Sequence, residues 1–271
     1  MSEPLRPSAP ALKTLRRLAR RRSARSEASR YLLDGPVLLG EAIDCSAPID
    51  TVYFETDADR ALRQRVATAG IQSVEVAPGA LAKVLDLAHP QSFVSVLRKR
   101  EVPSAEIVAS CAQRRRPVLA LVGIQDPGNA GTLIRVAEAT GCAGVLFTEG
   151  SVDAWNPKTV RASAGSVLRV PICTAVPLGL MAGHPKLARA NDPELVATVA
   201  SGGVAPEDAD LSGAKVILIG SEAHGLPREL RTVAAITVSV PMEGSVESLN
   251  AAVAGSLLAF EAARQRRHPL R

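Results

Sequence analysis

The sequence is poor in aromatic residues and cysteine, and it lacks long apolar runs. Only 3% of its 271 residues are Phe, Trp or Tyr, so few rings are available to stack unpaired RNA bases. The four cysteines stand far apart without a C-x-x-C pair, which argues against a zinc site and fits reduced thiols in the cytoplasm. No apolar run reaches the roughly 20 residues of a membrane helix, and the N-terminus has no apolar signal core.

Common enzyme signatures are also missing. The sequence contains no G-x-G-x-x-G fingerprint, P-loop, H-E-x-x-H or G-x-S-x-G. Dinucleotide redox chemistry, nucleotide hydrolysis, zinc proteolysis and serine hydrolysis therefore have no support, and no metal is expected. A hydrophobic content of 46% predicts instead an ordinary globular chain.

Positive charge is concentrated at the N-terminus. The first 30 residues hold nine Lys or Arg and two Glu, whereas the rest of the chain holds 23 basic and 25 acidic residues. A basic arm suits a phosphate backbone, where released counterions supply affinity without sequence preference. A solvated helix face or a disordered tail would give the same composition, so the charge alone leaves these alternatives open.

Hydrophobic periodicity predicts two α/β parts. Leu12, Leu15 and Leu18 have helical spacing, and strands are expected at 51–56, 71–77 and 93–99, with helices at 58–70 and 78–87. Residues 101–116 lack a clear period and are interpreted as a linker.

The second part alternates strands with helices, which predicts a mostly parallel sheet. Strands are expected at 117–125, 144–150, 215–222 and 235–241, and helices at 129–141, 226–234 and 248–264. Residues 158–172 are predicted to be a helix or loop that runs into a strand, and residues 194–200 fit either a strand or a helix.

Three glycine-bearing turns follow predicted strands in the second part. They read Q-D-P-G-N-A-G-T-L-I-R (125–135), G-S-E-A-H-G-L (220–226) and V-P-M-E-G-S-V-E-S-L-N (240–250). Ligands bind beyond the carboxyl ends of parallel strands, so the three turns predict one shared pocket. Each polar residue also has a structural explanation: Asn129 or Ser248 as a helix N-cap, Glu222 in a tight turn, Arg135 on the surface. The recurrence of polar residues at three strand ends favours a site.

These turns resemble the three motifs of the SpoU (TrmH) family of RNA 2'-O-ribose methyltransferases in the SPOUT superfamily. The segment N-P-K-T-V-R-A-S-A-G-S (156–166) is also similar to the family, and the resemblance spans residues 117–264. Residues 21–42 are similar to the start of the small substrate-binding domain found in many of these enzymes.

The resemblance implies an α/β protein with two domains. Residues 117–271 would form a SPOUT-type parallel sheet with a trefoil knot, a fold that is rare among proteins. Residues 1–103 would form a smaller α/β RNA-binding domain with the basic arm, and residues 104–116 would link the two. Family resemblance also implies a homodimer formed through the C-terminal domain, to which the apolar helix 248–264 would contribute.

The implied activity is 2'-O-ribose methylation of RNA with S-adenosylmethionine as methyl donor. Large-subunit (23S) ribosomal RNA is the favoured substrate, because the separate N-terminal domain suits a folded local element. A tRNA ribose methyltransferase and a non-catalytic ribosome-assembly factor remain the alternatives.

The resemblance also assigns residues. Donor contacts are expected from Gly220, Glu222, Val240, Met242, Leu249 and Asn250. The catalytic group is expected to comprise Arg135, Asn129, Glu222, Ser248 and Asn250. RNA contacts are expected from Arg16, Arg20, Arg21, Arg22, Arg25, Arg30 and Arg161. Because a guanidinium stays protonated, Arg135 is predicted to hold an RNA phosphate and polarise the 2'-hydroxyl.

Overall fold

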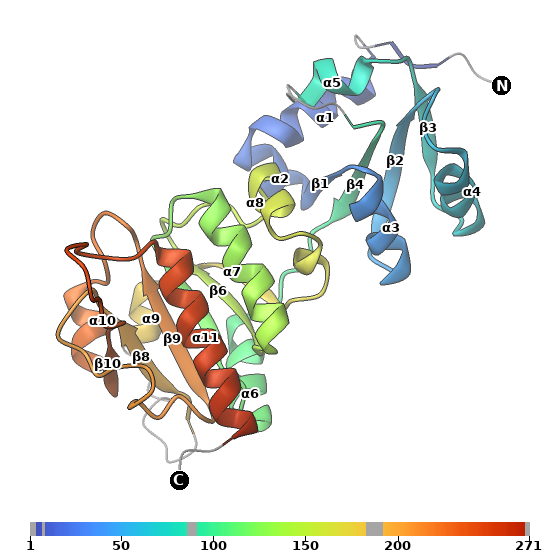
Figure 1. Cartoon of the computed structure of the whole chain (residues 1–271). Helices are drawn as coiled ribbons and strands as arrows, with labels where there is room; N and C mark the ends of the chain where they lie inside the picture. Colours follow the sequence, from blue (N-terminus) through green and yellow to red (C-terminus); the bar gives the residue numbers. More distant parts are fainter. Residues whose placement is uncertain (1–3, 7–8, 86–90, 183–191, 269–271) are drawn as a thin grey trace. The chain divides into compact units, whose positions relative to one another are not determined.

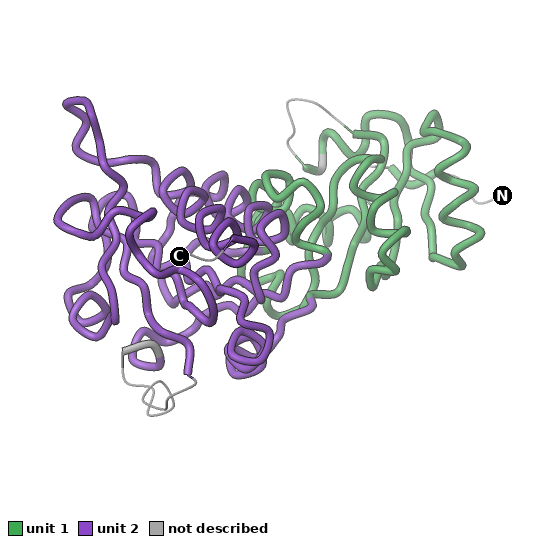
Figure 2. Tube along the Cα trace, turned by 60° about the horizontal axis from the view of Figure 1, so that its bottom comes forward, with its two compact units in different colours: residues 1–99, 155–168 green, residues 100–154, 169–271 purple. Residues whose placement is uncertain are grey.

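The computed structural model describes residues 4–6, 9–85, 91–182 and 192–268. The chain divides into two compact units (Figure 2). We call residues 1–99 with 155–168 the N-terminal unit, and residues 100–154 with 169–271 the C-terminal unit. None of the described helices has the length and apolar character needed to cross a membrane.

The N-terminal unit is built on a four-stranded sheet with the order β1-β4-β2-β3 (Figure 1). Strands β2 and β3 are parallel, and β4 pairs antiparallel with both β1 and β2. Its strands are β1 (Arg30–Asp34), β2 (Ile49–Glu55), β3 (Ser73–Val76) and β4 (Phe93–Arg98). Its first five helices are α1 (Pro10–Arg20), α2 (Arg22–Ala28), α3 (Pro36–Asp44), α4 (Arg60–Thr68) and α5 (Ala80–Leu85). Residues 86–87 of the predicted helix 78–87 lie outside the described residues.

The apolar spacing in the basic arm explains why α1 forms. Leu12, Leu15 and Leu18 are at most 2% exposed and pack with the buried strand residues Val94 and Val96. The arginines between these leucines stay at the surface, so α1 is amphipathic, as its sequence predicted. A second core on the other face of the sheet joins α3 and α4 to the strands through Leu39, Val52, Phe54, Leu62, Val66 and Phe93.

A short segment from the second half of the chain completes the N-terminal unit. Helix α8 (Pro157–Ala162) packs against β1, and a 3-10 helix (Ser166–Leu168) follows it. Trp155 is 1% exposed, and its ring centroid lies 4.8 Å from that of Tyr31. The predicted domains, residues 1–103 and 117–271, assign residues 155–168 to the C-terminal part, whereas the structure places them in the N-terminal unit. Apolar periodicity does not reveal which unit an element joins.

The C-terminal unit contains the parallel sheet that the sequence predicted. Six strands lie in the order β10-β8-β9-β5-β6-β7, and every pair is parallel. Residues 194–200, for which strand and helix were both open, include strand β8. The strands are β5 (Val118–Val122), β6 (Gly144–Thr148), β7 (Ile172–Val176), β8 (Glu194–Thr198), β9 (Lys215–Gly220) and β10 (Ile236–Val238).

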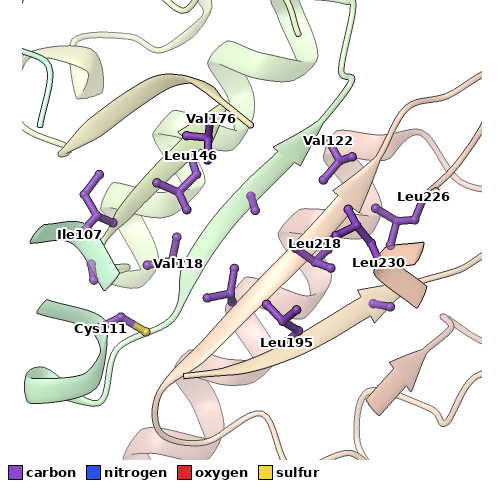
Figure 3. Close-up of a cluster of buried hydrophobic side chains, with 14 residues drawn as sticks. Ile107, Cys111, Val118, Val122, Leu146, Val176, Leu195, Leu218, Leu226 and Leu230 are labelled. Atoms are coloured by element: carbon purple, nitrogen blue, oxygen red, sulfur yellow. The ribbon is translucent and has the colours of Figure 1, made fainter. Parts of the chain in front are cut away.

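Helices cover both faces of this sheet. On one face, α6 (Ser104–Arg114) and α10 (Arg228–Val233) contribute Ile107, Cys111 and Leu230 to a core with the strands (Figure 3). On the other face, α7 (Pro127–Thr140) and α11 (Ala251–Arg267) pack together against the strands. The short helix α9 (Leu178–Ala182) follows β7.

The linker predicted at 104–116 is therefore mainly helix α6. Only Ile107 and Cys111 of its 11 residues are buried, and the other apolar residues do not mark one face, so the sequence shows no clear helical period. All four cysteines are free, and burial raises the pKa of Cys111 to about 12.

We expect the Trp155–Tyr31 contact to hold α8 in the N-terminal unit. Trp155→Ala should lower the free energy of unfolding by about 3–5 kcal/mol, because it removes a fully buried ring and leaves a cavity. Chemical denaturation followed by circular dichroism measures the loss. Trp155→Phe should lose less, and Val37→Ala, at a position that is 73% exposed, should change little. A Trp155→Ala protein as stable as the parent would show that the Trp155–Tyr31 contact does not stabilise the N-terminal unit.

Candidate functional site

The three predicted turns begin at one edge of the sheet. Strands β5, β9 and β10 run parallel, so their carboxyl ends lie at the same edge of the sheet. The turn after β5 leads into α7, whose N-cap is Asp126: its Oδ1 accepts a hydrogen bond from the Asn129 backbone N–H at 2.7 Å. Asn129 is therefore not the cap of this helix, and its side chain is available for another role.

The side chain of Asn129 joins the three turns. Its Nδ2 donates to a carboxylate oxygen of Glu222, in the turn after β9. Its Oδ1 accepts from Nδ2 of Asn250 at 3.0 Å, in the turn after β10. The two bonds use opposite ends of the amide, so they fix its orientation and hold together segments distant in sequence.

Asn250 has a second function at the start of α11. Its Oδ1 accepts hydrogen bonds from the backbone N–H groups of Ala252 and Val253, at 2.8 and 3.2 Å. The N-cap of the last helix is thus Asn250 and not Ser248. The same side chain stabilises α11 through Oδ1 and joins Asn129 through Nδ2.

A close backbone contact shapes the turn that carries Glu222. A Cβ atom at position 220 would lie 2.4 Å from the carbonyl carbon of Gly225 and 2.6 Å from the nitrogen of Leu226. Only glycine allows this approach. The turn is closed by a hydrogen bond from the Gly225 N–H to the Ser221 carbonyl at 2.8 Å, which places Glu222 beside Asn129.

A cavity of about 410 Å³ opens at this edge of the sheet. Its volume falls within the range of sites for small organic ligands. It is lined by Thr198, Val199, Ala200, Ile219, Gly220, Ser221, Glu222, His224, Gly225, Leu226, Arg231, Val240, Met242, Glu247, Ser248, Leu249, Ala251 and Ala254.

Most of the predicted donor contacts line this cavity. Asn250 is the exception, and it reaches the lining residue Glu222 through Asn129. Residues 198–200 and Arg231 of α10 form a wall of the cavity that the sequence did not predict. Residues 198–200 lie at the end of β8, a segment for which the sequence left strand and helix open, and Arg231 lies on a short helix with no motif.

Arg135 lies outside the cavity lining. It is exposed on α7, and within the described chain no hydrogen bond or ion pair holds its guanidinium. It lies six positions after Asn129, which corresponds to about 9 Å along the helix axis. Long helical side chains lean toward the helix N-terminus, so the guanidinium can approach the mouth of the cavity.

Two of the arginines predicted to bind RNA serve the N-terminal unit itself. Arg25 is 2% exposed, and its Nη1 donates to the carbonyls of Leu18 and Ala19 at 2.7 and 3.3 Å. The prediction that Arg25 contacts RNA is therefore wrong, because its buried guanidinium donates hydrogen bonds to backbone carbonyls at the end of α1. Arg30 is half-buried, and its Nε donates a hydrogen bond to Oδ2 of Asp50 at 2.5 Å.

The other predicted RNA contacts reach the surface. Arg16, Arg20, Arg21 and Arg22 are exposed on α1, on α2 and between them. Arg161 of α8 is partly exposed and lies 3.5 Å from Asp34. Burial raises the pKa of the Asp34 carboxyl, and the Arg161 guanidinium offsets part of that rise.

Comparison with known proteins gives consistent matches over most of the chain. The model of the SpoU rRNA Methylase family matches residues 116–260, and the MRM3-like substrate binding domain matches residues 9–95. The 23S rRNA (uridine(2479)-2'-O)-methyltransferase of Streptomyces viridochromogenes is 30% identical, over 90% of this chain and 86% of that relative. The 23S rRNA (guanosine(2553)-2'-O)-methyltransferase of Bacillus subtilis is 27% identical, over 87% and 89%.

A solved structure agrees with the fold. The AdoMet-bound rRNA methyltransferase from Sinorhizobium meliloti superposes with a TM-score of 0.82 at 29% identity, covering 97% of each chain. The family match covers more than half of the residues and includes all three turns that meet at Asn129. The chain belongs to the SpoU rRNA Methylase family.

Proposed function

We propose that this protein transfers the methyl group of S-adenosylmethionine to a ribose 2'-oxygen of large-subunit ribosomal RNA. The observation that carries the proposal is the Asn129–Glu222–Asn250 network beside a cavity of about 410 Å³. Family membership supports RNA methylation. The two relatives named for 23S rRNA and the AdoMet-bound neighbour support this substrate and this donor.

The residues around the cavity fit the proposed donor. S-adenosylmethionine supplies a methyl group that is already activated by a positively charged sulfonium. The carboxylates of Glu222 and Glu247 suit its positive groups, and Arg231 suits its carboxylate. Val240, Met242 and Leu249 give an apolar wall to the same cavity. Cavity size and charge distribution therefore match the donor.

Alignment is the main task left to the protein. Holding two reactants in line contributes up to about 7–11 kcal/mol to lowering a barrier. Asn129, whose amide is fixed at both ends, orients the reacting ribose or Arg135, while Glu222, Ser248 and Asn250 keep the pocket in shape. A guanidinium offers hydrogen-bond donors and no acceptor, so Arg135 holds an RNA phosphate and polarises the 2'-hydroxyl, and that phosphate shares the hydroxyl proton as the methyl group is transferred.

RNA is held mainly by the N-terminal unit. The exposed arginines Arg16, Arg20, Arg21 and Arg22 lie on the second half of α1 and at the junction with α2, and Arg161 of α8 adds a further cation to the same unit. Such a surface suits phosphates of folded RNA. The match to a substrate-binding domain over residues 9–95 supports this role. Work on ribosomal RNA is consistent with the predicted cytoplasmic location.

A second copy of the chain would cover an apolar stripe on α11. Val253, Leu257 and Phe260 are 48%, 45% and 51% exposed, and their spacing places them on one helix face. Exposed apolar residues in a continuous stripe are typical of an interface. The stripe supports a homodimer formed through the C-terminal unit.

The path of the chain supports the trefoil knot that the family resemblance implies. Strand β10 forms one edge of the sheet, and the segment after it lines the cavity. Helix α11 then packs against α7 and β9, two strands inward from that edge. We propose that the chain passes through the preceding turns to reach this position.

Mapping of ribose methylation tests the proposed function. Total RNA from a strain that lacks the gene should lose one or more 2'-O-methyl groups in 23S rRNA, and the purified protein should restore them with S-adenosylmethionine. Loss confined to tRNA would identify the tRNA alternative. Donor binding without any missing methyl group would favour the assembly factor.

Glu222→Gln tests the charge of the cavity. The substitution keeps an oxygen for Asn129 but removes a negative charge, so the Kd for S-adenosylmethionine should rise about threefold to tenfold. The Kd for S-adenosylhomocysteine, which lacks the sulfonium charge, should rise less. Isothermal calorimetry measures both. Equal effects on the two ligands would show that Glu222 does not face the sulfonium.

Arg135→Ala tests the acceptor side of the site. Methyl transfer should fall by about 100-fold or more, because the phosphate anchor and the polarising charge are lost together. Donor affinity should change less than twofold, because Arg135 lies outside the cavity lining. Tritium transfer to 23S rRNA and calorimetry separate the two effects. Unchanged transfer with intact donor binding would refute the role.

The dimer has its own test. Leu257→Asp places a charge in the middle of the stripe and should convert the protein to monomers at micromolar concentration, measured by light scattering. Val37→Asp makes the same change at an exposed position of the N-terminal unit and should leave the dimer intact. A parent protein that is already monomeric would contradict the proposal.

A further inference from the structure

The edge of the C-terminal unit opposite the cavity gathers helix ends. In a parallel α/β sheet each helix runs back against the strands, so the last turns of α6, α7 and α11 meet where the strands begin. Figure 1 shows the end of α11 beside α6 at this edge. Helix α11 has 17 residues, which puts its end about 25 Å from Asn250.

Arginines from two distant parts of the sequence meet at this edge. A Cβ atom at Gly141, the residue after α7, would lie 3.8 Å from Nη1 of Arg116 and 3.9 Å from Nη2 of Arg266. Arg267 lies close enough to Arg266 for its charge to act on that guanidinium, and Nη2 of Arg115 would lie 2.9 Å from a Cβ atom at Gly213, just before the start of β9. We call Arg115, Arg116, Arg266 and Arg267 the rear arginine cluster.

The rear arginine cluster has no acidic partner within the described chain. None of its four guanidiniums forms an ion pair there, whereas the nearby Arg264 is paired with Glu261. Nη1 of Arg266 is buried without a hydrogen-bond partner, and Nη2 donates to the Thr140 carbonyl at 2.6 Å. Burial, with the neighbouring charges of Arg116 and Arg267, lowers the pKa of Arg266.

Helix ends explain only part of this arrangement. Cations near a helix C-terminus are stabilised by the helix dipole. The carbonyl of Thr140 at the end of α7 accounts for one nitrogen of Arg266 in this way. The exposed guanidiniums of Arg115, Arg116 and Arg267 are left with charge and donors that an anion would satisfy.

We propose that the rear arginine cluster binds phosphates of the RNA substrate, an inference that rests on the proposed function for the identity of the partner. At about 25 Å from the start of α11, the cluster cannot touch the nucleotide being methylated. It is a second contact for the backbone of a folded RNA. Guanidiniums suit this task, because their planar donors match phosphate oxygens.

A pair of double variants with equal charge tests the proposal. Arg116→Gln with Arg267→Gln removes two charges from the cluster and spares the Thr140 bond of Arg266. Arg100→Gln with Arg228→Gln removes two exposed charges elsewhere in the C-terminal unit. Binding of a 23S rRNA transcript is measured against salt concentration, and thermal melting followed by circular dichroism confirms that each variant folds.

The cluster variant should bind the transcript about tenfold more weakly at moderate salt. Its plot of log affinity against log salt should be shallower by about 1.4–1.8, the value for two lost phosphate contacts. Calorimetry should give an unchanged Kd for S-adenosylmethionine. The control pair should keep the parent slope.

Equal slopes for the two pairs would overturn the proposal, even if the parent methylates 23S rRNA. If the parent binds the transcript without methylating it, the proposed function fails. A shallower slope for the cluster variant would then still support the phosphate contact.

Discussion

The candidate site depends on one amide. Asn129 donates to Glu222 and accepts from Asn250, so a single side chain ties together three turns that follow three different strands. Removing it would leave a donor and an acceptor without their partners and would free two loops at once. Because Asn250 also caps α11, the loss would extend to the longest helix of the C-terminal unit.

Close packing makes this network possible. Gly220 lets the turn that carries Glu222 fold back onto Gly225 and Leu226, and Gly255 lets α11 approach Ile219 and Leu133. A Cβ atom at Gly255 would lie 2.6 Å from Cδ1 of Ile219 and 2.7 Å from Cδ2 of Leu133, which is too close for any larger residue. Small residues therefore set the position of the N-cap residue Asn250 relative to the sheet. From that position Asn250 reaches Asn129 and forms its hydrogen bond.

The sequence predicted the meeting of the three turns because parallel strands impose it. Once β5, β9 and β10 are recognised, their carboxyl ends must share an edge, and motif residues such as Asn129 and Glu222 must lie near one another. Other features depend on packing that no local pattern records. Helix α6 buries only two side chains, α8 joins a unit distant in sequence, and Arg25 turns inward to the end of α1. Each is decided by tertiary contacts, which override local propensity.

The number of charged residues in the sequence likewise does not predict where charge gathers in the fold. The excess of positive charge lies in the first 30 residues, and the rest of the chain is slightly acidic in sum. The fold nevertheless brings Arg116 and Arg266 to one helix end, where no acidic side chain of the described residues pairs with either guanidinium. A sum of charges over the sequence cannot show this local grouping of arginines, because attraction for RNA depends on the local electric field and not on the net charge of the chain.

The two ends of α11 lie at opposite edges of the sheet and serve different purposes. Its N-terminal cap belongs to the network beside the cavity, and its last turn carries arginines at the opposite edge. A substrate that meets both ends must span about 25 Å, so it must extend well beyond the nucleotide being methylated.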